Sequence, residues 1–122
     1  MAALGIVFDA PENGTGGPQG AKRPIDLDLL QKQTMGDPAL ETEVLQLFAR
    51  QARCCVLEMA SGDRATIVAT AHRLKGAAGA VGALDVSDAA EQLEAMPGDA
   101  ARMARLHAAV TVAENFILKL CR

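Results

Sequence analysis

The chain has 122 residues, half of them hydrophobic, with only three aromatic side chains, all Phe, and a formal net charge of -3. This length suits one domain with a single core, and the small aliphatic side chains favour closely packed helices over a β-sandwich. The slightly acidic balance provides no basic face of the kind that nucleic-acid binding usually needs, so we expect no nucleic-acid partner.

The cysteines and the N-terminal residues set the expected compartment. Cys54 and Cys55 are adjacent, Cys121 stands alone, and no Cys-x-x-Cys pair occurs, so neither a disulfide framework nor a metal site is expected. The first apolar run is too short for a membrane span and lacks the basic start of a signal peptide. We therefore expect a soluble, cytoplasmic protein with reduced thiols and no membrane association.

The first part of the chain differs from the rest. Residues 9–24 are dense in Gly and Pro and show no apolar periodicity, so residues 1–23 are predicted to form a flexible leader. Residues 24–122 read as helical throughout and are predicted to form one domain. Its first element is a short helix within residues 24–36, with Asp26 near its start and Gly36 as its stop.

Two longer helices are predicted next. Asp37 and Pro38 are typical of the cap and first position of a helix that ends near residues 61–62. Its apolar stripe comprises Leu45, Phe48, Ala52, Cys55 and Met59, widened by Val44, Leu47 and Val56. Asp63 is predicted to cap the following helix, whose inner face comprises Ile67, Ala71, Leu74, Ala78 and Val81.

Two further helices complete the pattern after a break near residues 82–83. For the shorter one, Asp85 or Ser87 is the expected cap, and its stripe comprises Val86, Ala90, Leu93 and Met96. Asp99 caps the last helix, with a stripe of Met103, Leu106, Val110, Ala113, Ile117 and Leu120. Short connections between amphipathic helices favour antiparallel neighbours. The predicted fold is all-α: an antiparallel four-helix bundle with an additional short N-terminal helix.

His72 is predicted to lie on the outer side of the third long stretch of helix, roughly 130° from the inner stripe at about 100° per residue. Its neighbours one or two turns away are small or aliphatic, apart from a single lysine: Val68, Ala69, Lys75, Gly76 and Gly79. A lone helical histidine is usually an inert solvated side chain. However, glycine weakens a helix interior by about 1 kcal/mol, and core packing does not account for glycines on this outer side. We interpret them as space for a partner that must reach the imidazole.

Phosphoryl transfer fits these residue types. A neutral imidazole is abundant near neutral pH, and its unprotonated nitrogen attacks phosphorus without a separate base. Lys75 lies on the same face at i+3, where it can neutralise charge on the phosphoryl oxygens. No Gly-rich nucleotide-binding loop occurs, so the chain is predicted to carry a phosphoryl group without ATP-dependent kinase activity of its own.

The segment HRLKGAAGAVGA, residues 72–83, followed by AAEQLEAM, residues 89–96, is similar to the motif of histidine-containing phosphotransfer (HPt) domains of multistep two-component phosphorelays. The resemblance implies that His72 is the phosphorylated residue, Lys75 the charge partner of the phosphoryl group and Gly76 the residue that clears space for it. It also implies that Glu94, or Gln92 in another register, lies near the histidine. A carboxylate there would orient the Nδ1–H and leave Nε2 as the nucleophile; the other interpretation of Glu94 is a solvated surface side chain.

The resemblance implies a relay function. His72 accepts a phosphoryl group from the receiver-domain aspartate of a hybrid sensor histidine kinase and passes it to the aspartate of a response regulator. No cofactor is expected on this chain, and Mg²⁺ is expected on the partner receiver domain. We expect a monomer with a small, transient docking surface. The residues expected to contribute to docking are Val68, Ala69, Arg73, Gly79, Leu30 and Met35.

Two other functions compete with the relay. The phosphoacceptor domain of a sensor kinase typically carries His-Glu-[Leu/Phe]-x-[Thr/Asn]-Pro, whereas this chain has Arg73 after the histidine and no following proline. A helical adaptor that binds receiver domains without being phosphorylated would use the same apolar strip, and the sequence leaves that alternative open.

Overall fold

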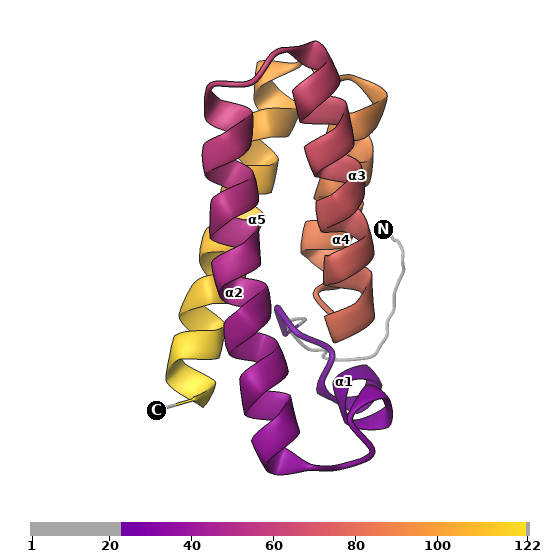
Figure 1. Cartoon of the computed structure of the whole chain (residues 1–122), viewed down its shortest axis with the longest axis vertical. Coiled ribbons are helices and arrows are strands. Elements are labelled where there is room, and N and C mark those ends of the chain that lie inside the picture. The colour runs from indigo at the N-terminus through magenta and orange to yellow at the C-terminus, as the bar shows by residue number, and fades with distance from the viewer. Residues whose placement is uncertain (1–22, 122) are drawn as a thin grey trace, which may run out of the picture.

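A computed structural model describes residues 23–121, which form five α-helices and no strand. In Figure 1 all the helices except the short first one lie side by side as a helical bundle. Their bounds are α1 Leu27–Gln33, α2 Pro38–Ala60, α3 Arg64–Val81, α4 Leu84–Ala95 and α5 Ala100–Leu120. The predicted leader lies outside the described residues, apart from Arg23. Within residues 23–121 no helix is long and apolar enough to cross a membrane.

Aspartate side chains cap four of the five helices; three of these caps are as predicted, and Asp26, predicted near the start of the first helix, is the fourth. Asp26, Asp37, Asp63 and Asp99 each accept hydrogen bonds from backbone N–H groups in the first turn of α1, α2, α3 and α5. The prediction of Asp85 or Ser87 as the cap of α4 is wrong, because Ala83 is the N-cap and makes no side-chain cap bond. Since α3 ends at Val81 and α4 begins at Leu84, only Gly82 and Ala83 connect them.

The apolar stripes meet in one core. α3 packs against α2 and most extensively against α4, α5 packs against α4 and α2, and α1 packs against α3. Most of the predicted stripe residues are buried; they include Leu45, Leu74, Leu93 and Leu106, each no more than 1% exposed. Packing therefore covers α3 on the sides that face α2 and α4, and α1 contacts it as well.

Three residues assigned to the stripes are in fact exposed. Leu47 is 58% exposed, Met96 50% and Leu120 48%. Leu47 lies at the outer edge of the α2 stripe, beyond the reach of the neighbouring helices. Met96 is the C-cap of α4, and Leu120 is the last residue of α5, so both lie at helix ends, where fewer neighbours cover a side chain.

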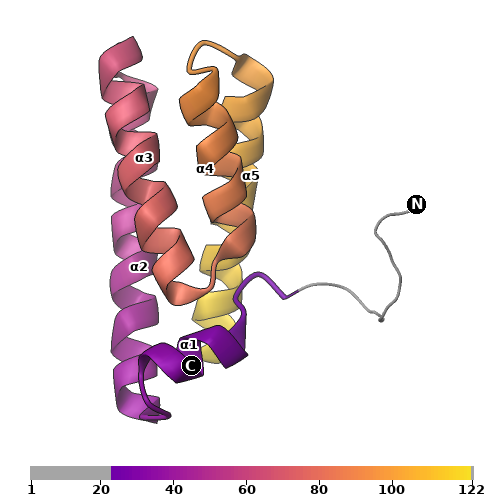
Figure 2. The same cartoon turned by 90° about the vertical axis from the view of Figure 1, so that its right-hand side faces the viewer.

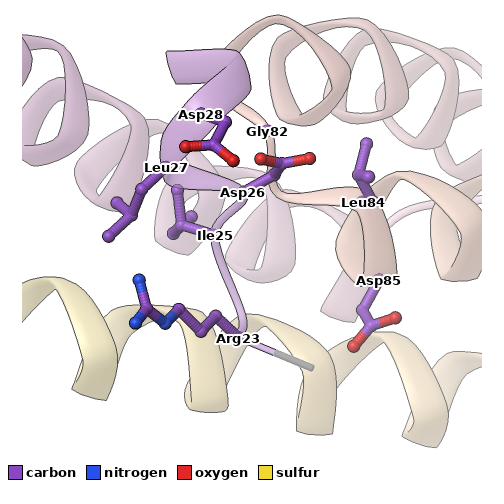
Figure 3. A pocket seen from close by; sticks show the side chains of 8 residues that line it. All are labelled: Arg23, Ile25, Asp26, Leu27, Asp28, Gly82, Leu84 and Asp85. Atoms are coloured by element: carbon purple, nitrogen blue, oxygen red, sulfur yellow. The ribbon is translucent and has the colours of Figure 1, made fainter. Parts of the chain in front are cut away.

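Gly82 ends α3 and holds the segment that leads into α1. It adopts a left-handed conformation with φ of 83°, which glycine accepts without steric cost. The Asp26 N–H donates to the Gly82 carbonyl at 2.8 Å, and a Cβ at Gly82 would lie 2.7 Å from the Asp26 carbonyl oxygen. Figure 2 shows α1 lying across this end of the bundle. A shallow pocket of about 530 Å³ opens here (Figure 3), and none of the predicted site residues lines it.

Candidate functional site

His72 stands at the middle of α3, on the side that neither α2 nor α4 covers. Its side chain is 68% exposed, whereas Ala71, Leu74 and Ala78 on the opposite side of the same helix are fully buried. The prediction that His72 points away from the core is therefore confirmed. The buried stripe anchors the helix, and the imidazole is presented to solvent from a rigid element.

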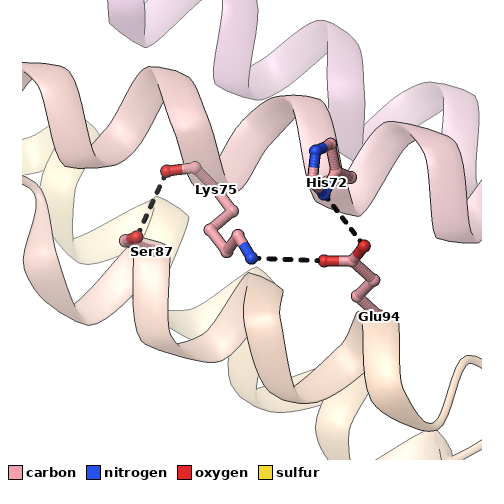
Figure 4. A network of polar contacts seen from close by, with 4 residues as sticks. All are labelled: His72, Lys75, Ser87 and Glu94. Atoms are coloured by element: carbon pink, nitrogen blue, oxygen red, sulfur yellow. Dashed lines mark hydrogen bonds and ion pairs between the residues drawn. The ribbon is translucent and has the colours of Figure 1, made fainter.

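Glu94 on α4 holds the histidine ring. Its Oε2 lies 2.9 Å from His72 Nδ1, and Figure 4 shows the other ring nitrogen on the side away from the carboxylate. An ionised carboxylate only accepts hydrogen bonds, so this contact assigns the proton to Nδ1 and leaves the Nε2 lone pair free. The expected juxtaposition of Glu94 and His72 is present, and it reaches across from α4 to α3.

Gln92 does not take this place. Its side-chain amide donates to Asp88 at 3.4 Å, a contact within α4. Two residues along a helix correspond to a rotation of about 200°, so Gln92 and Glu94 face different directions. The alternative register with Gln92 beside the histidine is therefore wrong.

Lys75 completes a chain of polar contacts around the same carboxylate. Its Nζ lies 3.6 Å from Glu94 Oε1, with the lysine side chain 33% exposed and the glutamate side chain 26% exposed. The Ser87 hydroxyl on α4 donates to the Lys75 backbone carbonyl at 3.1 Å, as Figure 4 shows. Both contacts join α3 to α4 directly beside His72. The sequence predicts Ser87 only as one of two candidate caps of α4, although its position two turns before Glu94 places it on the same side of that helix.

The two glycines near His72 are not required by packing within the chain. A Cβ built on Gly76 meets nothing within 4 Å, and one built on Gly79 meets only the Ser87 hydroxyl, at an ordinary contact distance of 3.7 Å. Gly76 is exposed, so it leaves open surface directly after Lys75. The interpretation that core packing does not explain Gly76 is confirmed.

Most of the residues predicted for docking are accessible. Ala69 is exposed and Val68 half-buried on α3, and Met35 is 91% exposed in the turn between α1 and α2. The prediction for Leu30 is wrong, because its side chain is only 1% exposed and packs into the core where α1 meets the bundle. The sequence of so short a helix does not show which of its faces turns toward the core.

Arg73 is exposed but not free, because its guanidinium pairs with Glu58 on α2 and donates to Cys55 Sγ at 3.9 Å. These contacts, the one with Cys55 first, raise the pKa of Arg73 above its usual range, and burial raises the pKa of the Cys55 thiol. The pairing with Glu58 was missed because no pattern in the sequence sets the rotation of α2 against α3.

Within residues 23–121, no group of three or more His, Cys, Asp or Glu side chains is arranged to hold a metal ion. The site therefore consists of one exposed imidazole, one carboxylate and one ammonium group on two adjacent helices. Such a set supplies a nucleophile, a group that fixes its tautomer and a positive charge beside it.

Comparison with known proteins identifies the family. The family model described as Hpt domain matches residues 43–116, well over half of the chain, and this span includes His72, Lys75 and Glu94. No curated protein and no solved structure matches the chain. The outward histidine and its carboxylate partner lie within the matched span, together with α3, α4 and most of α2 and α5, and the chain belongs to the Hpt domain family.

Proposed function

We propose that this protein is a phosphorelay intermediate that carries a phosphoryl group on His72. Membership of the Hpt domain family implies histidine phosphotransfer with receiver domains and histidine kinases as partners. The observation that carries the assignment to His72 is its geometry: an imidazole 68% exposed, with Nδ1 held by Glu94 at 2.9 Å. The free Nε2 is thereby presented as the nucleophile.

The proposed transfer begins when a receiver domain carrying an aspartyl phosphate docks over α3. The Nε2 lone pair forms a bond to phosphorus, the bond from phosphorus to the aspartate oxygen breaks, and the electron pair leaves with the carboxylate. Negative charge on the phosphoryl oxygens is stabilised by Lys75, one turn along the same face. The reverse sequence passes the group to the aspartate of a response regulator.

The partner surface is proposed to surround His72. Val68, Ala69 and Gly76 present small groups there, with Arg73 at the α2 side and Met35 at the turn that precedes α2. Gly79 leaves room in the turn after Gly76. We expect transient docking of a cytoplasmic monomer, with Mg²⁺ on the receiver domain and no cofactor on this chain.

The antiparallel four-helix arrangement with α1 as an added short helix is part of the same proposal. It is supported by the packing of each helix from α2 to α5 against two of the others, and by connections of only two to four residues between them.

The decisive experiment follows labelled phosphate from a phosphorylated receiver domain, freed of nucleotide, to this protein. The relay predicts acid-labile, alkali-stable label on the wild type and none on the His72→Gln variant, which keeps a polar side chain of similar size. A folded wild type that binds receiver domains but never gains label would contradict the relay and support the adaptor. Label acquired from ATP alone would instead indicate a kinase.

A further inference from the structure

Glu94 is shared between two groups on α3. One oxygen accepts from His72 Nδ1 at 2.9 Å, and the other lies 3.6 Å from Lys75 Nζ. The contact with the ring has the length of a direct hydrogen bond, whereas the contact with the ammonium group is a looser ion pair. In this resting state the positive charge of Lys75 is directed to Glu94, away from the place where a phosphoryl group would be attached.

Phosphoryl transfer changes the charges around Glu94. When Nε2 forms its bond to phosphorus, the proton on Nδ1 stays in place, so the ring becomes a cation beside the Glu94 carboxylate. The attached phosphoryl group brings two negative charges to the other side of the ring. The carboxylate then has a cation at hydrogen-bond distance without Lys75, and Lys75 has a doubly charged anion within one helical turn.

We propose that Lys75 and Glu94 exchange partners when His72 is phosphorylated: Glu94 stays with the cationic ring, and Lys75 moves from Glu94 to the phosphoryl oxygens. This inference rests on the proposed phosphotransfer function. It adds a resting state in which Lys75 is paired with Glu94 until His72 is phosphorylated. Loss of the phosphoryl group to a receiver returns Lys75 to Glu94.

The surroundings permit this movement. The Lys75 side chain is 33% exposed, and ion pairs at such positions are weak and easily broken. Gly76 follows it with open space around its Cα, since a Cβ there would meet nothing within 4 Å. The Ser87 hydroxyl holds the Lys75 backbone carbonyl at 3.1 Å, so only the flexible four-carbon stem has to reorient.

The test observes the ammonium group of Lys75 directly by ¹⁵N NMR of protein labelled at lysine Nζ. The chain has four lysines, Lys22, Lys32, Lys75 and Lys119, and Lys75→Arg assigns the signal. Phosphoramidate, a small phosphoryl donor to imidazole nitrogen, replaces the receiver domain, and ³¹P NMR measures phosphohistidine. As phosphohistidine forms, the Lys75 signal is expected to shift in proportion, while those of Lys32 and Lys119 stay in place. In His72→Gln treated in the same way, the Lys75 signal should not move.

Glu94→Gln makes the exchange distinguishable from a general response to charge. The amide oxygen still accepts from Nδ1, but the ion pair with Lys75 is lost. We expect the Lys75 signals of wild type and Glu94→Gln to differ before phosphorylation and to converge after it, because Lys75 has then left position 94. Glu91→Gln, which removes a charge from an exposed residue of the same helix, should match the wild type in both states.

Two results would overturn the partner exchange and leave the proposed phosphotransfer function standing. One is complete phosphohistidine formation with an unmoved Lys75 signal, and the other is a difference between wild type and Glu94→Gln that persists after phosphorylation. Conversely, an exchange seen with phosphoramidate in a protein that no receiver domain labels would leave the exchange standing and contradict the relay. Failure of phosphoramidate to modify the folded wild type at His72 would overturn the exchange as well as the nucleophilic role of His72.

Discussion

The chemistry of the site depends on the arrangement of three side chains. Without a partner, His72 would be a solvated imidazole with two accessible tautomers. Glu94 at 2.9 Å from Nδ1 selects one of them, because a carboxylate accepts and does not donate. Lys75 adds a positive charge one turn along α3, where it pairs with the other oxygen of Glu94. A single carboxylate on α4 therefore contacts both His72 and Lys75 on α3.

Replacing Lys75 by alanine is expected to slow phosphoryl transfer by about tenfold or more, because a positive charge beside the transferred group is lost. The free energy of unfolding should change by less than about 0.5 kcal/mol, since the side chain is partly exposed and its ion pair is weak. Rapid-quench transfer from a labelled receiver domain and thermal unfolding check the two effects. Lys75→Arg, which keeps the charge, is the matched control, and an undiminished rate in Lys75→Ala would contradict the role of Lys75.

Gly76→Ala separates stability from function. Since nothing lies within 4 Å of the added methyl group, the helix should gain about 1 kcal/mol from the higher propensity of alanine. Transfer from receiver domains should nevertheless slow, and Gly76→Leu should slow it further, because the side chain occupies the docking space. Urea unfolding and transfer kinetics on the same samples measure both. A stabilised Gly76→Leu variant with wild-type transfer would show that Gly76 clears no space for a partner.

At the scale of elements, α3 carries His72 and is capped at both ends. The Asp63 side chain accepts from the Thr66 N–H at 2.8 Å, and Gly82 closes the helix in a left-handed conformation. Between them, the buried stripe faces α2 and α4, and the opposite side carries His72. The neighbouring α4 contributes Glu94 and Ser87, which contact His72 and Lys75.

The cap of α3 makes stability depend on acid pH. The Thr66 backbone N–H, followed by its hydroxyl, lowers the pKa of Asp63 below its ordinary value of 3.8. Because the folded-state pKa is the lower one, the stabilisation is complete above the unfolded-state pKa and is lost as pH falls through the folded-state pKa. Asp63→Ala should therefore lower the melting temperature at pH 7, and its difference from wild type should shrink below about pH 4.

Circular dichroism melts between pH 2 and pH 7 check this dependence. Asp63→Asn keeps an oxygen that can accept from the first turn, so it should melt close to the wild type at low pH and show less pH dependence. A difference between Asp63→Ala and wild type that is the same at pH 7 and pH 2 would be inconsistent with a carboxylate cap.

At the scale of the whole molecule, the site depends on a core built from small aliphatic contacts. Leu74 is fully buried and lies two residues from His72, on the inner side of the same helix. Leu74→Ala should lower the free energy of unfolding by about 2–5 kcal/mol, because it removes buried methyl groups and leaves a cavity. Leu57→Ala, at a position 62% exposed, should cost less than about 0.5 kcal/mol. Equal losses for the two variants in denaturant unfolding would contradict the packing.

The rate of chemical modification of Cys55 measures how often the core around it opens. Its thiol is buried, and burial raises its pKa, so the reactive thiolate is disfavoured in the folded protein. With Cys54 and Cys121 replaced by serine, modification of Cys55 by a disulfide reagent should be at least about a hundredfold slower than in denaturant. Above the ordinary thiol pKa the unfolded chain loses the proton first, so stability should fall as pH rises. Rapid modification in native buffer would show that this part of the core is open.

Many features of this protein could be predicted from its amino-acid sequence, because they depend on local interactions. The helical class, three aspartate caps, the Gly82 stop and the outward direction of His72 follow from helical periodicity and from contacts within one or two turns. The resemblance of residues 72–83 and 89–96 to the HPt motif indicated Glu94 as a partner of His72. Packing between helices decided the rest, because the rotation and height of one helix against another depend on many side chains at once. Only the tertiary structure therefore shows that Gln92 does not lie beside His72, that Leu30 is buried and that Leu47 is exposed. It also shows that Arg73 pairs with Glu58 and that Glu94 lies between His72 and Lys75.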